Sequence, residues 1–259
     1  MRILYKLINH EFRFIYKLVI LIAVILILGQ NILIYIAARD YPPGRYIPFE
    51  DLLKVSGAPV VFYICFVLIL ACYVYSVVSN YYGSKSIYTL MSIPGSRPLI
   101  YLSKVISGFI YLMMLASSQF ISIFLGYLFF STSYTVSDTE GFLSFEKPVN
   151  GLFLAFVRSD FLRFLFPMSG ESVVSTCIIA VSVMLGIFFA SYCILAHRYF
   201  QLGFPLINLF IVILVGNKRN NALYGENQNL YIYSFILLAL GIYYVYQSIR
   251  WLKKSAILG

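Results

Sequence analysis

Six long apolar runs constrain this chain more than any other feature of its 259 residues. An apolar helix of about 20 residues spans the hydrocarbon core of a bilayer. The runs cover residues 18–38, 58–78, 105–130, 172–196, 199–215 and 230–246. Charged residues make up only 11% of the chain, against about 25% in soluble domains. We therefore predict an all-α polytopic membrane protein with six transmembrane helices.

Basic residues are unequally divided between the two sides of the predicted bilayer. With the N-terminus in the cytoplasm, one acid, Glu11, and eleven basic residues fall on the cytoplasmic side: Arg2, Lys6, Arg13, Lys17, Lys85, Arg97, Lys104, Arg198, Arg250, Lys253 and Lys254. The other eight basic and nine acidic residues fall outside. Because cytoplasmic loops retain Lys and Arg, both termini are expected in the cytoplasm. We expect a multi-pass protein of the cell membrane, of the bacterial inner-membrane type.

The net charge of +9 follows from this topology and from contact with anionic lipid headgroups. It gives no reason to expect nucleic-acid binding. The four cysteines fall inside predicted spans and have no metal-ligand spacing, so no metal site is expected.

The fifth run is the weakest, since only residues 202–215 are uninterrupted. Parity supports it, because the C-terminal basic cluster reaches the cytoplasm only after an even number of crossings. Gly203 and Pro205 predict that this helix is tilted or partly unwound at its start.

Residues 2–17 predict a basic amphipathic elbow helix in the cytoplasmic headgroup layer. Its basic stripe includes Arg13, and its apolar residues recur at helical spacing: Leu4, Leu7, Ile8, Phe12 and Ile15. The segment is either a simple topology anchor or an elbow that also touches a cytoplasmic partner.

The two larger outer loops differ in character. Residues 39–57 contain three prolines and predict a turn-rich connection. Residues 131–171 begin acidic and continue into an apolar stretch interrupted by Arg158, Asp160 and Arg163, which is too short to span. We predict an amphipathic or partly re-entrant helix that caps the outer surface, with ion pairs favoured over joint chemistry among these charged residues and Glu171.

Polar side chains inside the spans are candidates for a translocation path. They are Gln30, Asn31, Ser118, Gln119, Ser122 and Asn208. The alternative is plain hydrogen bonding between helices, which is the usual role of such residues in lipid.

No phosphate-binding loop and no hydrolase or metalloprotease motif occurs in the sequence, and no catalytic residue is expected. None of the six predicted spans contains Asp or Glu, which argues against ion-coupled transport and against a diacid protease.

The most distinctive cytoplasmic segment is residues 81–97, between the second and third spans. A short helix is predicted to begin near Gly83 and to end before Pro94. Ile87, Leu90 and Met91 share one face of it, at spacing i, i+3, i+4. A groove on another protein could bury this apolar face, although a connector lying on the membrane remains an alternative.

The stretch from Ser86 to Arg97, SIYTLMSIPGSR, followed by Ser103-Lys104, resembles the permeases of type-2 ATP-binding-cassette transporters. The elbow, the six spans and the absence of an ATPase domain are similar to that family's plan. Many relatives have Glu at the start of the coupling helix, whereas this chain has Ser84-Lys85-Ser86.

The resemblance implies that the segment contacts an ATPase, through Ser84, Lys85, Ser86, Ile87, Tyr88, Leu90, Met91, Pro94 and Arg97. It implies a complex of two permease subunits, identical or different, with two ATP-binding subunits. ATP and Mg would be bound by those partners, and no cofactor by this chain. The expected function is export of an amphiphilic or hydrophobic cargo such as a lipid, peptide or antimicrobial. The alternative is a membrane scaffold or sensor that docks a cytoplasmic partner through the same segment.

Overall fold

A computed structural model describes residues 2–40, 48–82, 97–133, 151–167, 169–221 and 230–253. These residues are 94% helical, and no strand occurs among them. Six of the helices are long and apolar enough to cross a membrane. The predicted all-α, multi-pass architecture is thereby confirmed.

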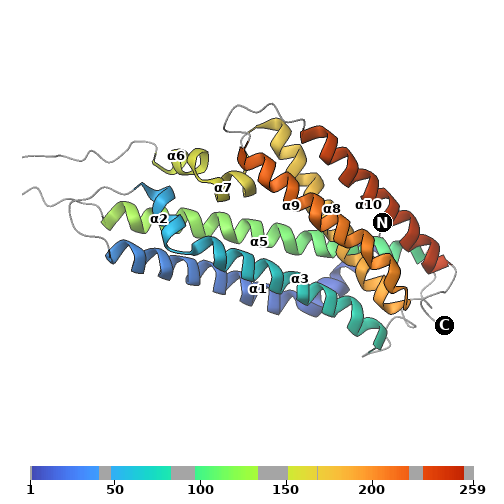
Figure 1. The fold of residues 1–259 in the computed structure, drawn as a ribbon. Coiled ribbons are helices and arrows are strands. Elements are labelled where there is room, and N and C mark those ends of the chain that lie inside the picture. The colour runs from blue at the N-terminus through green and yellow to red at the C-terminus, as the bar shows by residue number, and fades with distance from the viewer. Residues whose placement is uncertain are drawn as a thin grey trace, which may run out of the picture. The chain divides into compact units, whose positions relative to one another are not determined.

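The six long helices match the six predicted runs in order (Figure 1). They are α1 (Arg2–Arg39), α3 (Ala58–Tyr82), α5 (Arg97–Ser133), α8 (Gly170–Leu195), α9 (Gly203–Asn221) and α10 (Leu230–Lys253). The predicted start of the second run at residue 58 coincides with the start of α3. Among the described residues, four shorter elements lie between them in sequence: α2 (Phe49–Val55), α6 (Gly151–Arg158), α7 (Asp160–Leu165) and the 3₁₀ turn η1 (Tyr199–Leu202).

Helix α1 joins the predicted elbow and the first span in one helix of 38 residues. The boundary expected near residue 17 is absent because no Gly or Pro interrupts residues 2–28. One buried stripe runs along the helix, consisting of Leu7, Glu11, Ile15, Val19, Ile22, Leu26, Gln30 and Ile34. The first turns of α1 therefore take part in the same packed surface as the spanning part.

Helix α5 has 37 residues and begins at Arg97, ahead of the predicted start at residue 105. Pro98 lies in the first turn, where backbone N–H groups have no acceptor within the helix, so its missing N–H costs no helical hydrogen bond. At about 1.5 Å per residue, α1 and α5 are each about 55 Å long, which exceeds the roughly 30 Å of the hydrocarbon core.

The fifth run begins with η1 and continues as α9, which agrees with the predicted irregularity near Gly203. Pro205 lies in the first turn of α9 and leaves the remainder regular. Its 19 residues extend roughly 28 Å, enough to span most of a hydrocarbon core.

The chain forms two compact units, each assembled from separate stretches of sequence. Unit 1 consists of residues 1–19, 69–113 and 169–259, and unit 2 of residues 20–68 and 114–168. Helices α1, α3 and α5 contribute one part to each unit.

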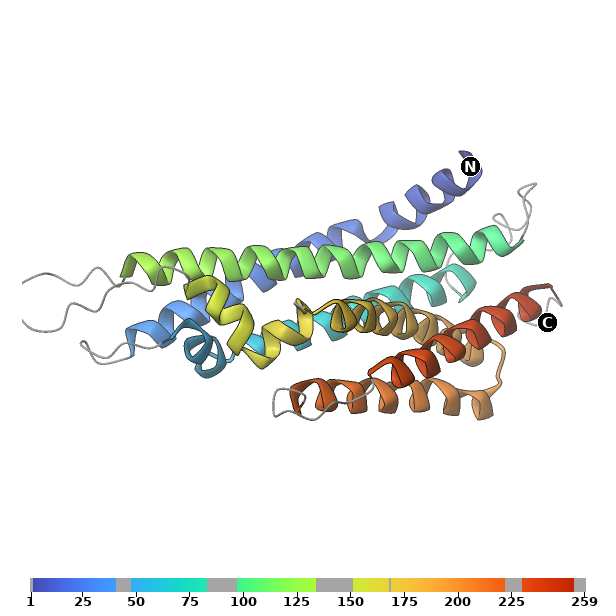
Figure 2. The same cartoon turned by 90° about the horizontal axis from the view of Figure 1, so that it is seen from above.

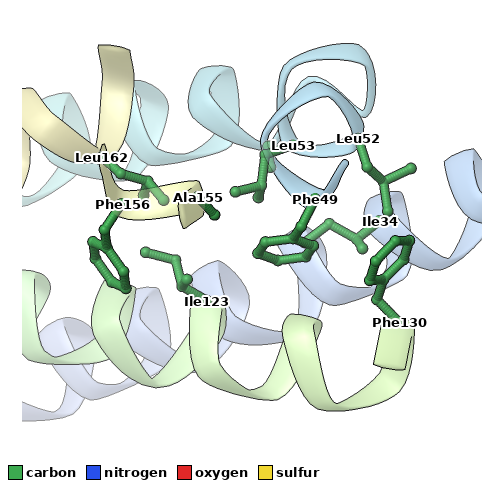
Figure 3. Packing of buried hydrophobic residues seen from close by; sticks show 10 residues of the cluster. Ile34, Phe49, Leu52, Leu53, Ile123, Phe130, Ala155, Phe156 and Leu162 are labelled. Carbon is green, nitrogen blue, oxygen red and sulfur yellow. The ribbon is translucent and has the colours of Figure 1, made fainter. Parts of the chain in front are cut away.

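In unit 2, the short helices α2, α6 and α7 form a cap on α1 and α5. Their apolar side chains point toward one another in a single cluster (Figure 3), formed by Ile34, Phe49, Leu52, Leu53, Ala58, Ile123, Phe130, Ala155, Phe156 and Leu162. The predicted cap at residues 131–171 is thus two short helices within the described residues 151–165. Helix α2 lies within residues 39–57, where the sequence predicted only a turn-rich loop. It follows Pro48 and has Glu50 and Asp51 in its first turn.

In unit 1, helices α8, α9 and α10 lie side by side (Figure 2). Ser182 Oγ donates a 2.7 Å hydrogen bond to Asn208 Oδ1, and Tyr244 Oη donates one to the Phe204 carbonyl at 2.9 Å. Phe189 stacks between Tyr244 and Trp251, with ring centroids 5.0 and 5.3 Å away. These contacts fix α9 and α10 on α8.

Candidate functional site: a buried ion pair between α1 and α5

Most of the predicted ATPase-coupling residues lie outside the described residues. These are Ser84, Lys85, Ser86, Ile87, Tyr88, Leu90, Met91 and Pro94. Arg97 is the first residue of α5. The structure does describe the helices on both sides, α3 up to Tyr82 and α5 from Arg97.

A buried ion pair joins α1 to α5, seven residues after the start of α5. Lys104 Nζ lies 2.9 Å from Glu11 Oε1, and the two side chains are only 1% and 6% exposed. Removing one partner of such a pair costs about 3–5 kcal/mol, because the other charge is left uncompensated. The two residues are 93 positions apart in sequence, so the pair fixes a long-range contact.

Helix α5 holds Glu11 by its backbone as well. Tyr111 Oη donates a hydrogen bond to the Glu11 carbonyl oxygen at 3.1 Å. Phe12 stacks on the Tyr111 ring, with centroids 5.9 Å apart. Leu7 and Ile100 pack together one turn away from the pair on each helix. The contacts restrain both the rotation and the register of α1 against α5.

Helix α3 reaches the same place through Tyr73, whose hydroxyl donates to the Lys104 carbonyl oxygen at 3.3 Å. Gly108 permits this approach, since a Cβ at that position would lie 2.8 Å from the Tyr73 ring. The aromatic side chain is itself buried. Tyr73 thus links α3 to the helix turn that carries the lysine.

Helix α8 completes the surroundings with Phe188. Its ring meets Tyr101 edge-on, with centroids 4.9 Å apart, and lies 6.3 Å from the Tyr73 ring. Four helices of unit 1 therefore meet around Glu11, Tyr73, Lys104 and Tyr111, which we call the charged node.

The predicted elbow residues agree with this packing. Leu7 and Ile15 are buried, whereas Arg13 on the opposite stripe is exposed. Leu4, Ile8 and Phe12 are half-buried. The predicted apolar face of residues 2–17 is accordingly the face that packs in the fold.

Five of the six translocation-path candidates lie together in unit 2. Gln30 Nε2 donates to Gln119 Oε1 and to the Ala58 carbonyl oxygen, both at 2.9 Å. Asn31 Nδ2 donates to Ser122 Oγ at 3.3 Å. Ser118 Oγ donates within its own helix, to the Leu115 carbonyl oxygen. Apart from the Ser118 bond, these contacts join α1 to α3 or α5, which is the pattern of the alternative, hydrogen bonding between helices.

The sixth candidate, Asn208, lies in unit 1 and also bonds between helices. Its Oδ1 accepts from Ser182 Oγ, and its Nδ2 donates to the Ser182 carbonyl oxygen at 3.0 Å. Gly186 leaves room for the amide, since a Cβ there would lie 2.8 Å from Asn208 Nδ2.

The charged residues of the predicted outer cap form pairs, as the cap hypothesis predicts. Arg158 lies 3.4 Å from Glu50 of α2, and Arg163 lies 3.0 Å from Asp160. Glu171 lies in the first turn of α8 and belongs to unit 1, whereas the two pairs belong to unit 2.

The sequence interpretation missed the charged node because it placed Glu11 in the headgroup layer and Lys104 in the cytoplasmic segment before the third span. A signal was present, since Glu11 falls between Leu7 and Ile15 at a spacing of four on the apolar face. An acid in that position, the single acid of a 38-residue helix, indicates a buried partner. The sequence pattern does not identify which basic residue is that partner.

The chain is an all-α, multi-pass membrane protein. Comparison with protein families, with curated proteins and with solved structures finds no match.

Proposed function

We propose that this chain is the membrane-spanning permease subunit of an ATP-driven exporter, of the type-2 ATP-binding-cassette kind. The observation that carries the proposal is that α3 and α5, the two helices that flank residues 83–96 in sequence, are joined by the Tyr73–Lys104 hydrogen bond. A displacement of the segment that connects two linked helices can be passed on to both of them.

The partner is a separately encoded ATPase. This chain has no phosphate-binding loop, so the energy for transport must come from another subunit. Ile87, Leu90 and Met91 offer the apolar face for docking, and the basic residues place the segment with the termini on the cytoplasmic side. Two copies of this chain, or this chain and a second permease, would assemble with two ATPase subunits that bind ATP and Mg.

The proposed class of cargo rests on which charged residues occur within the spans. Only two acids, Glu11 and Glu171, occur in the six apolar helices, and Glu11 is neutralised by Lys104. With no carboxylate left near the middle of a span, ion coupling lacks its usual carrier. An uncharged, aromatic-rich interior favours an amphiphilic or hydrophobic cargo, such as a lipid, a peptide or an antimicrobial compound, moved outward.

The test begins with purification of the tagged chain from its own membranes. We expect an ATPase to co-purify and its activity to respond to a fluorescent phospholipid or an amphipathic peptide. Leu90→Asp with Met91→Asp should abolish the complex and the ATP-dependent movement of the probe. Thr89→Asp, on the opposite face of the same predicted helix, is the matched control and should leave both unchanged.

The outcomes separate the candidates. An unchanged complex in the Leu90→Asp/Met91→Asp variant would show that the coupling assignment is wrong. A bound partner without any ATPase response to cargo would favour the scaffold or sensor function.

The orientation is tested separately with reporter fusions. A reporter placed after Gly259 is expected to be active only in its cytoplasmic form, and one inserted between residues 222 and 229 only in its external form. An external reporter after Gly259 with an internal Met1 would contradict the even number of crossings.

A further inference from the structure

The charged node lies close to the end of α3 and to the start of α5, the two helices that flank the predicted coupling segment in sequence. Lys104 is seven residues into α5, and Tyr73 is nine residues before the end of α3. At about 1.5 Å per residue, these positions are roughly 10 and 14 Å from those two helix ends. A displacement of the segment would therefore need to be transmitted along only a few turns of α3 or α5 to reach the node.

At the node, the two flanking helices are linked directly. Tyr73 Oη bonds to the Lys104 carbonyl, and Gly108 allows the Tyr73 ring to pack against the α5 backbone. Because these contacts are buried, water does not compete for them. The ends of α3 and α5 are expected to move as one body.

The ion pair adds α1 to this body. Lys104 holds the Glu11 carboxylate, and Tyr111, two turns further along α5, holds the Glu11 carbonyl oxygen. Two contacts on one residue of α1 resist both sliding and rotation of that helix. Apolar packing between helices gains no hydrophobic driving force in lipid, since acyl chains are as apolar as the side chains, so polar contacts add to the van der Waals packing.

From this geometry we infer, on the basis of the proposed function, that Glu11 and Lys104 are positioning residues that transmit motion of the coupling segment to α1. A push on residues 83–96 would displace α5, and the ion pair would carry α1 with it. The pair binds neither cargo nor ATP. Its role is to make the amphipathic start of α1 follow α5 during each cycle of the ATPase.

The experiment uses the whole complex in proteoliposomes and measures transport per ATP hydrolysed. Glu11→Gln should assemble with the ATPase and hydrolyse ATP, but its transport per ATP should fall at least tenfold. The exchanged variant Glu11→Lys/Lys104→Glu should recover a large part of the loss. Asp160→Asn, which breaks an exposed ion pair in unit 2, is the control and should change neither quantity.

A purely structural role predicts a different result from a second variant. Glu11→Leu/Lys104→Met replaces the pair by apolar side chains, a change that buried ion pairs commonly tolerate without loss of stability. We expect this variant to fold, to bind the ATPase and to remain uncoupled. It also keeps the test decisive if Glu11→Gln does not fold.

Normal transport per ATP in the Glu11→Leu/Lys104→Met variant would overturn the inference while leaving the proposed function intact. Absence of ATP-driven transport by the wild-type complex would instead overturn the proposed function, and the inference with it.

Discussion

The side-chain amide of Gln30 lies between two acceptors of unit 2 and donates to both. Its Nε2 is 2.9 Å from Gln119 Oε1 on α5 and 2.9 Å from the carbonyl oxygen of Ala58, the first residue of α3. One side chain therefore connects three helices. Gln30 and Gln119 are each 1% exposed, so water does not compete for these bonds in the folded protein.

Replacing Gln30 alone should destabilise unit 2. Gln30→Leu leaves Gln119 Oε1 and the Ala58 carbonyl without their donor, at a cost of about 0.5–2 kcal/mol for a bond between membrane helices. The measurement is the midpoint of thermal unfolding in detergent. The double variant Gln30→Leu/Gln119→Leu removes both amides and should cost less than the sum of the single changes. Additive losses would show that the two amides do not interact.

Gly108 should not accept a side chain. An added Cβ would lie 2.8 and 2.9 Å from two atoms of the buried Tyr73 ring and would also meet Met184. Overpacking of this kind costs about 1–3 kcal/mol. Gly108→Ala should therefore lower the unfolding midpoint. The matched control is Gly203→Ala, where nothing lies within 4 Å of the new Cβ and no loss is expected. Equal stability of the two variants would contradict the close approach of α3 to α5.

In the cap of unit 2, apolar packing should contribute far more to stability than the ion pair. Leu162 is fully buried in the apolar cluster, so Leu162→Ala should cost about 2–5 kcal/mol. Arg158 is 61% exposed, and its 3.4 Å pair with Glu50 is open to solvent. Arg158→Ala should change stability by less than about 1 kcal/mol. The measurement is the protease resistance of the cap, which should fall more in Leu162→Ala than in Arg158→Ala. A greater effect of the arginine substitution would show that the ion pair holds the cap.

His197 follows the C-cap of α8 and has a left-handed backbone conformation, which glycine usually adopts at this position of a helix end. Its φ is 52°, its N–H donates to the Ile194 carbonyl at 3.2 Å, and the Arg198 N–H donates to the Cys193 carbonyl at 2.9 Å. This is the hydrogen-bond pattern of a Schellman motif after α8. His197→Gly should stabilise the protein by up to about 1 kcal/mol, because it removes the left-handed strain.

The control for that change is His197→Ala, which removes the imidazole but keeps a Cβ at positive φ. It should give no gain in the unfolding midpoint in detergent. A gain in His197→Ala as large as in His197→Gly would attribute the effect to loss of the ring, including its 3.3 Å contact with Tyr199, and not to the backbone.

Local sequence was sufficient to locate the six long helices of the fold. The start of α3 at residue 58, an irregular start of the fifth run near Gly203 and the apolar face of residues 2–17 all follow from hydropathy and from the positions of Gly and Pro. Helix boundaries were less predictable. The first span and the elbow were separated because the charge of residues 2–17 changes their hydropathy, whereas helix continuity depends on backbone hydrogen bonds that charge does not interrupt.

Partners of the polar residues could not be derived in the same way. Gln30 and Asn31 are adjacent in sequence and bond to Gln119 and Ser122, which are also on one helix, but nothing in either pattern specifies the pairing. Any buried amide in lipid needs a partner, and several candidates were available. The choice depends on which helices pack together and at which register.

The sequence by itself determined that the chain is helical and crosses a membrane, because apolar length and the need to satisfy backbone hydrogen bonds in lipid leave few other structures. Only the tertiary structure decided that Glu11 meets Lys104, that Tyr73 reaches the Lys104 carbonyl, and that three short helices form a cap. These contacts join residues far apart in the chain, and their geometry is set by helix packing, which no local pattern encodes.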